Sequence, residues 1–203
     1  MPEALFPSHV LRRFVDTLSA ELGMDTLAAV LEKAGLPAEW VHSEHFGPLD
    51  DARAAEAYAR LQAALRTYYG RGARSILLRI GVNLWTALLS EAPFGLKTQS
   101  SLVRGLPASL RRKPTLELLA RLLSAGDGDL TVHTLDLDLL LVDHASPTTL
   151  GQSDPAPICF LTQGLVREAL YRALGEEHDI EETTCRAMGA ADCEFKITIG
   201  RRG

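Results

Sequence analysis

The chain has 203 residues, of which 46% are hydrophobic and 23% are charged, and its formal net charge is -5. This composition is typical of a soluble globular protein with a sizeable core. The acidic balance creates no field that attracts a polyanion, so we expect no nucleic-acid partner. No apolar run reaches the roughly 20 residues of a membrane span, and the N-terminus lacks a secretory signal pattern. We therefore expect a cytoplasmic protein.

The first 125 residues are predicted to be mainly helical. Apolar residues recur at helical spacing, and Gly or Pro residues separate the segments. The predicted helices are 8–22, 24–34, 52–69, 73–91 and 98–125, the last divided or kinked by Pro107 and Pro114. Segment 73–91 is apolar on more than one face, which predicts a central, buried helix.

The periodicity changes at Gly126. From Leu130 to Leu141, leucines alternate with polar residues, as they do in half-buried strands. The later predicted elements are a helix from Leu161 to Leu174 and strands at 179–187 and 193–199. The sequence thus predicts an α+β fold in one domain, 1–203, in which a helical portion (1–125) precedes an antiparallel sheet (within 126–199).

Three cysteines, Cys159, Cys185 and Cys193, lie in the C-terminal part. An odd number argues against a secreted disulfide framework. With one carboxylate the three thiols would form a closed four-ligand set, which is typical of structural zinc, but buried thiols that pack as small hydrophobes fit the same spacing. On strand periodicity Glu181 would share a face with Cys185, whereas Glu182 would need a bulge to do so.

The segment from Gly126 to Ile199 resembles the 4-vinyl reductase domain family. The matching features are Cys159 with Gly164 five residues later, the E-x-x-C motif from Glu182 to Cys185, the turn glycine Gly189, and Cys193 with Phe195 two residues later. The pattern is most similar to the zinc-containing sensory domains of phenol-responsive bacterial activators. The resemblance implies a structural zinc ion held by Cys159, Glu182, Cys185 and Cys193, with Glu182 preferred to Glu181 because the motif is E-x-x-C.

The resemblance also implies the fold of heme/nitric-oxide-binding sensors and vesicle-tethering subunits, a ligand cavity between helices and sheet, and a homodimer. Trp85 and Phe94, at the end of the most apolar helix, are candidates to line that cavity, although core packing is the favoured role for each taken singly. His133 is a further candidate, with the solvent face of a strand as the alternative. Ile180 lies where the phenol sensors carry a pocket aromatic residue.

The function expected from these features is non-catalytic binding or sensing of a small apolar or aromatic molecule. The sequence has no G-x-G-x-x-G pattern after a strand, no phosphate-binding P-loop and no G-x-S-x-G nucleophile motif. A zinc ion with four protein ligands has no open position to activate water. Two alternatives follow from the family: an accessory protein or reductase of (bacterio)chlorophyll synthesis that handles a tetrapyrrole, and a protein-assembly scaffold without a ligand.

Overall fold

The computed structural model describes residues 4–199. Its helices are α1 (Ser8–Leu22), α2 (Met24–Lys33), α3 (Asp51–Tyr69), α4 (Ala73–Glu91), α5 (Phe94–Gly105), α6 (Ala108–Leu123) and α7 (Phe160–Leu174). Its strands are β1 (Leu130–Leu135), β2 (Asp138–Asp143), β3 (Asp179–Thr184) and β4 (Cys193–Thr198), which pair antiparallel in the order β1-β2-β4-β3. The predicted α+β fold with an antiparallel sheet is confirmed.

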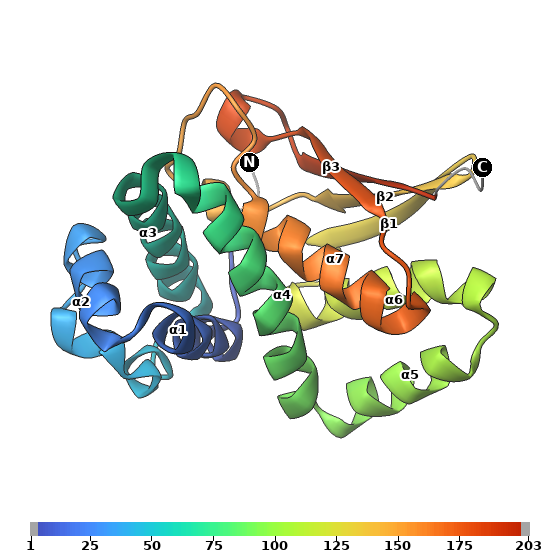
Figure 1. Ribbon diagram of the computed structural model, residues 1–203, viewed down its shortest axis with the longest axis horizontal. Coiled ribbons are helices and arrows are strands. Elements are labelled where there is room, and N and C mark those ends of the chain that lie inside the picture. The colour runs from blue at the N-terminus through green and yellow to red at the C-terminus, as the bar shows by residue number, and fades with distance from the viewer. Residues whose placement is uncertain (1–3, 200–203) are drawn as a thin grey trace.

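Figure 1 shows α6 and α7 below the sheet, while α1, α2 and α3 form a group on the left. Helix α4 runs between this group and α7, and its buried side chains include Leu77, Ile80 and Leu84, as predicted for a central helix. The sheet buries alternate residues on its helix-facing side, among them Leu141 and Phe195, both with no exposed surface. The strands are therefore half-buried, as their alternating pattern predicts.

The predicted helix 98–125 is two helices in the structure. Pro107 caps the start of α6 and separates it from α5, because proline fits the first positions of a helix better than its interior. Pro114 lies inside α6 without ending it. Helix α5 begins at Phe94, directly after Pro93, which occupies the N-cap position. This early start determines where the Phe94 side chain lies.

Helices α4 and α7 cross with their backbones in direct contact. A Cβ atom on Gly81 would overlap the carbonyl oxygen of Leu161, and one on Gly164 would overlap the carbonyl oxygen of Leu78. Only glycine permits so close an approach. Gly164, one of the residues that carry the family resemblance, therefore positions α7 against α4.

None of the helices within residues 4–199 combines the length and the apolar character that crossing a bilayer requires.

We predict that Gly164→Ala lowers the free energy of unfolding by about 1–3 kcal/mol, because the added methyl group has to push the two backbones apart. The matched control is Gly95→Ala, since an added Cβ on this α5 glycine meets no atom within 4 Å. Alanine there should raise the stability by up to about 1 kcal/mol through its helix propensity. Urea unfolding of both variants and of the wild type measures their free energies of unfolding. If Gly164→Ala were as stable as the wild type, the close crossing of α4 and α7 would be contradicted.

Candidate metal centre

The structure brings together the four side chains that the resemblance assigns to a metal. Each of Cys159, Glu182, Cys185 and Cys193 offers one ligand atom, and these atoms all lie within 4.8 Å of one another. The three cysteines have no exposed surface, Glu182 is 4% exposed, and none of the cysteines forms a disulfide. Cys193 Sγ lies 3.7 Å from Cys159 Sγ and 3.9 Å from Cys185 Sγ. The cluster is a closed, buried set of four potential ligands.

Three separate parts of the fold supply these ligands. Cys159 precedes the first residue of α7, Glu182 lies on β3, and Cys193 is the first residue of β4. The pairing of β3 with β4 shifts register between Glu182 and Thr184. This irregularity is the bulge that strand periodicity requires if Glu182 is to join Cys185. Glu181, its neighbour, is exposed.

The sulfur positions fit a tetrahedral zinc site. Zinc–sulfur bonds of about 2.3 Å place neighbouring sulfur atoms about 3.8 Å apart in a tetrahedron, close to the two separations observed. The carboxylate of Glu182 fits as well: Oε2 accepts a hydrogen bond from the Cys159 backbone N–H at 2.9 Å, while the buried Oε1 has no hydrogen-bond partner within residues 4–199. A buried carboxylate oxygen without a partner is costly, and a cation at the centre of the cluster would satisfy it.

The Glu182 carboxyl and the Cys159 thiol do not ionise readily on their own. Burial raises the pKa of Glu182 to about 8. Hydrogen bonds with Cys185 and Cys193, together with burial, raise the pKa of the Cys159 thiol well above its ordinary value. Thiolates and carboxylates are the forms that bind metal, so a divalent cation would provide the positive charge that these residues lack.

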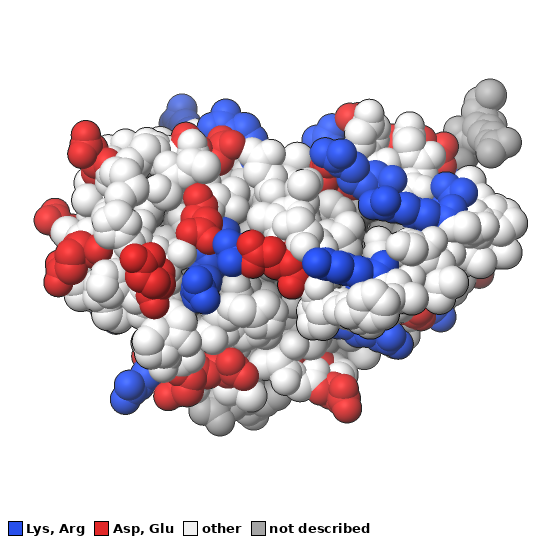
Figure 2. All heavy atoms as spheres, turned by 90° about the horizontal axis from the view of Figure 1, so that it is seen from below, with Lys and Arg blue, Asp and Glu red and all other residues white. Residues whose placement is uncertain are grey.

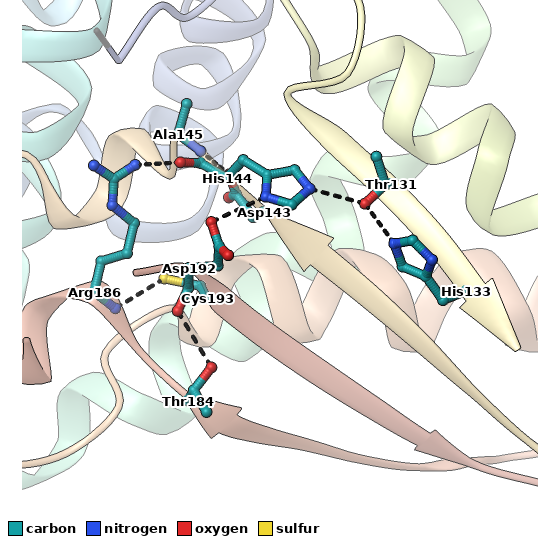
Figure 3. Close-up of polar contacts among 9 residues, drawn as sticks. All are labelled: Thr131, His133, Asp143, His144, Ala145, Thr184, Arg186, Asp192 and Cys193. Carbon is teal, nitrogen blue, oxygen red and sulfur yellow. Dashed lines mark hydrogen bonds and ion pairs between the residues drawn. The ribbon is translucent and has the colours of Figure 1, made fainter. Parts of the chain in front are cut away.

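The surrounding residues hold the cluster in place (Figure 3). The backbone N–H of Arg186 donates a hydrogen bond to Cys193 Sγ at 3.3 Å, and its guanidinium group donates to the carbonyl oxygen of His144 at 2.6 Å. His144 Nδ1 lies 2.9 Å from Asp192 Oδ1, next to Cys193 in sequence. These contacts attach the turn between β3 and β4 to the end of β2. The pairing of His144 with Asp192, 48 positions away in sequence, was not predicted from the sequence.

The four residues predicted to bind the ligand do not come together. Trp85 is 3% exposed and packs in the core, which is the alternative role considered for it. His133 is exposed on the sheet, where its Nε2 lies 2.9 Å from Thr131 Oγ1. Ile180 is half-buried and lines an open, largely polar cleft between α4, α7 and β3. The expectation that Phe94 lines an internal cavity is wrong: as the first residue of α5 it is 85% exposed.

A narrower and more enclosed cleft lies between the helices and the sheet, and its free volume of about 20 Å³ holds about one water molecule. Its walls are mainly apolar, and its lining includes Phe6, Tyr58, Leu123, Leu130, Asp143 and Leu165. The rings of Phe6 and Tyr58 stack at 4.1 Å. Burial raises the pKa of Asp143 to about 7, although hydrogen bonds from Ser146 and Ala145 oppose the shift. Sequence reasoning did not single out Asp143. Its position at the end of a leucine-rich strand was the one feature of the sequence that could have marked it as a candidate.

Residues 144–199 match the model of the V-4-R domain, the 4-vinyl reductase domain. The matched segment contains all four candidate metal ligands and confirms the family resemblance seen in the sequence. No curated protein matches the chain.

Three solved structures show the same fold. An H-NOX protein from S. oneidensis in the Fe(II)NO ligation state has a TM-score of 0.58 and 18% identity, with 96% of this chain and 99% of that chain covered. An oxygen-binding H-NOX domain related to soluble guanylate cyclases has a TM-score of 0.55 and 17% identity over 94% and 93%. A Fe(II) unliganded H-NOX protein from K. algicida has a TM-score of 0.56 and 13% identity over 96% and 97%. The predicted heme/nitric-oxide-binding fold is thus confirmed.

We predict that His144→Ala lowers the free energy of unfolding by about 1 kcal/mol, because it removes the contact with Asp192 while leaving the carbonyl that Arg186 binds. His133→Ala is the matched control, since His133 also contacts Thr131 but not the turn that carries the cysteines. It should change the stability by less than about 0.5 kcal/mol. Chemical unfolding measures both; equal effects would show that the His144–Asp192 contact does not stabilise the turn.

Proposed function

We propose that this protein is a non-catalytic small-molecule-binding domain of the sensor type, with a structural zinc ion at Cys159, Glu182, Cys185 and Cys193. The observation that carries the metal proposal is the unpartnered Oε1 of Glu182 among three buried, unpaired thiols. Four protein ligands complete a tetrahedral shell, so the zinc ion would have no position for water or substrate. Its role would therefore be to hold the structure together.

Such a zinc ion would cross-link a short segment that has little regular secondary structure of its own. The segment between β3 and β4 contains a single 3-10 turn, Arg186–Met188, and Met188 is 49% exposed. Metal bonds to Cys185 and Cys193 would fix both ends of this segment, and the bond to Cys159 would join it to α7. Because an unfolded chain has no such preformed site, the metal-binding free energy would contribute to folding.

We expect purified protein to contain about one zinc ion per chain. Glu182→Gln should lower the zinc content and reduce the unfolding midpoint by roughly 5–10 °C, because the amide is a poor zinc ligand although it still accepts the Cys159 N–H. Glu181→Gln, on the same strand but exposed, is the control and should retain both properties. Metal analysis and thermal unfolding provide the measurements. If wild-type protein contained no zinc and were as stable without zinc as with it, the site would be excluded.

The enclosed cleft is the ligand site that we propose. Its apolar walls suit a small aromatic or apolar molecule, and the Asp143 carboxyl and the Tyr58 hydroxyl provide polar groups inside it. Because the cleft is narrow, such a molecule has to move the loop at its edge in order to enter. Ser146, whose Oγ lies 3.7 Å from Cys159 Sγ, is in the same loop as the cleft residues Ala145 and Pro147. A ligand that moves this loop would therefore also act on the metal centre, which is a physical route for sensing.

Ala145→Leu should abolish the binding of a small phenol, because Ala145 lines the enclosed cleft and is 4% exposed, so that a larger side chain fills the space. Ala156→Leu places the same side chain at an exposed position and is the control. Titration calorimetry with phenol measures the affinity of both variants and of the wild type. Equal phenol binding by Ala145→Leu and the control would rule out this cleft as the site.

The open cleft between α4, α7 and β3 gives little support to the tetrapyrrole alternative. Its His178 has a 3% exposed side chain, and both ring nitrogens are engaged: Nε2 accepts from Arg112 Nε at 3.3 Å, and Nδ1 lies 3.2 Å from the Glu176 carbonyl oxygen. This histidine therefore offers no free nitrogen as an iron ligand.

Native mass spectrometry with an absorption spectrum separates the candidate functions. A Soret-type band would favour tetrapyrrole handling, and a protein without any bound molecule would favour the scaffold. The homodimer that the family resemblance implies stays a prediction.

A further inference from the structure

Helices α5 and α6 expose large apolar side chains together with basic ones. Phe94 is 85% exposed, Leu102 is 69% exposed and Leu110 is 60% exposed. On α5, the helical step of about 100° per residue places Phe94 opposite Val103, the buried residue of this helix. Leu102 lies about 80° to one side of Phe94, and Lys97 and Arg104 lie about 60–80° to its other side. We define the α5–α6 face by its exposed residues Phe94, Lys97, Leu102, Arg104, Leu110 and Lys113.

The α5–α6 face is also basic in a chain that is acidic overall. Residues 92–116 contain five Lys and Arg residues and no Asp or Glu, whereas the whole chain has a net charge of -5. Two of the five are half-buried and engaged elsewhere: Arg111 donates to backbone carbonyl oxygens, and Arg112 pairs with Glu176 at 2.8 Å. Figure 2 shows the Lys and Arg side chains gathered on the right half of the face seen from below, on the side where α5 and α6 lie in Figure 1. Within residues 4–199, Lys97 and Arg104 have no carboxylate partner, and Lys113 lies 4.0 Å from Glu117.

The geometry points to an anionic membrane surface as the partner of the α5–α6 face. We propose that Phe94 and Leu102 insert at the boundary between headgroups and acyl chains, while Lys97, Arg104 and Lys113 contact lipid phosphates. Cations flanking exposed apolar residues on one helix surface are the pattern of interfacial helices, and polybasic segments are attracted to anionic leaflets. A second copy of the chain is a poorer occupant, because it would place like charges opposite each other. The inference is independent of the zinc ion and of the ligand.

The test is sedimentation of the full chain with vesicles of phosphatidylglycerol and phosphatidylcholine in equal parts. We expect binding that weakens as salt is added, and no binding to vesicles of phosphatidylcholine alone. The double variant Lys97→Gln with Arg104→Gln should bind about 25-fold more weakly, since each basic residue near an anionic surface contributes about fivefold. Phe94→Ser should also weaken binding, because it removes the most exposed apolar side chain.

Leu137→Ser is the matched control. Leu137 is 81% exposed, but it lies between Asp136 and Asp138 in the β1–β2 turn, so we expect its loss to leave vesicle binding unchanged. An unchanged unfolding midpoint in every variant confirms that folding is intact. The absence of binding to anionic vesicles at low salt, or equal binding by all variants, would overturn the proposal. Binding to soluble polyglutamate without binding to vesicles would assign the face to an acidic protein instead.

Discussion

The contact between a cysteine at the start of α7 and two cysteines on the β3–β4 hairpin connects the helical and sheet parts of this fold. Cys159, Cys185 and Cys193 lie in van der Waals contact without a disulfide, and the carboxylate of Glu182 completes the group. Four buried groups of acidic character are unfavourable together unless they share protons or a cation. The zinc ion that we propose would turn this unfavourable arrangement into a cross-link between α7 and the β3–β4 hairpin.

The enclosed cleft and the metal centre are neighbours for a structural reason. Residues 144–149 join the end of β2 to the next segment and contribute both to the wall of the cleft and to the contacts around Cys159. Gly81 and Gly164 hold α4 against α7 and so set the position of the cysteine that precedes α7. The enclosed cleft, the helix crossing and the candidate metal centre are therefore connected through adjacent backbone segments.

Sequence reasoning predicted the features that depend on local pattern. Helical spacing located the major helices. Strand periodicity alone favoured Glu181, and only the family resemblance selected Glu182, which the irregular pairing of β3 with β4 brings beside the three cysteines. Sequence reasoning could not predict features that depend on tertiary packing. The exposure of Phe94 follows from the start of α5 at this residue, and the pairing of His144 with Asp192 joins residues 48 positions apart. The resemblance implied a cavity between helices and sheet, but the residues that line the enclosed cleft could not be predicted because they come from many elements.

The central claim is that one metal ion is bound by three sulfur atoms and one carboxylate oxygen. X-ray absorption at the zinc edge, on protein purified without added zinc, tests this claim directly because it identifies both the metal and its neighbouring atoms. We expect an absorption edge for zinc and a first shell of three sulfur atoms and one oxygen atom. A first shell of oxygen and nitrogen only, or the absence of zinc from well-folded protein, would contradict it.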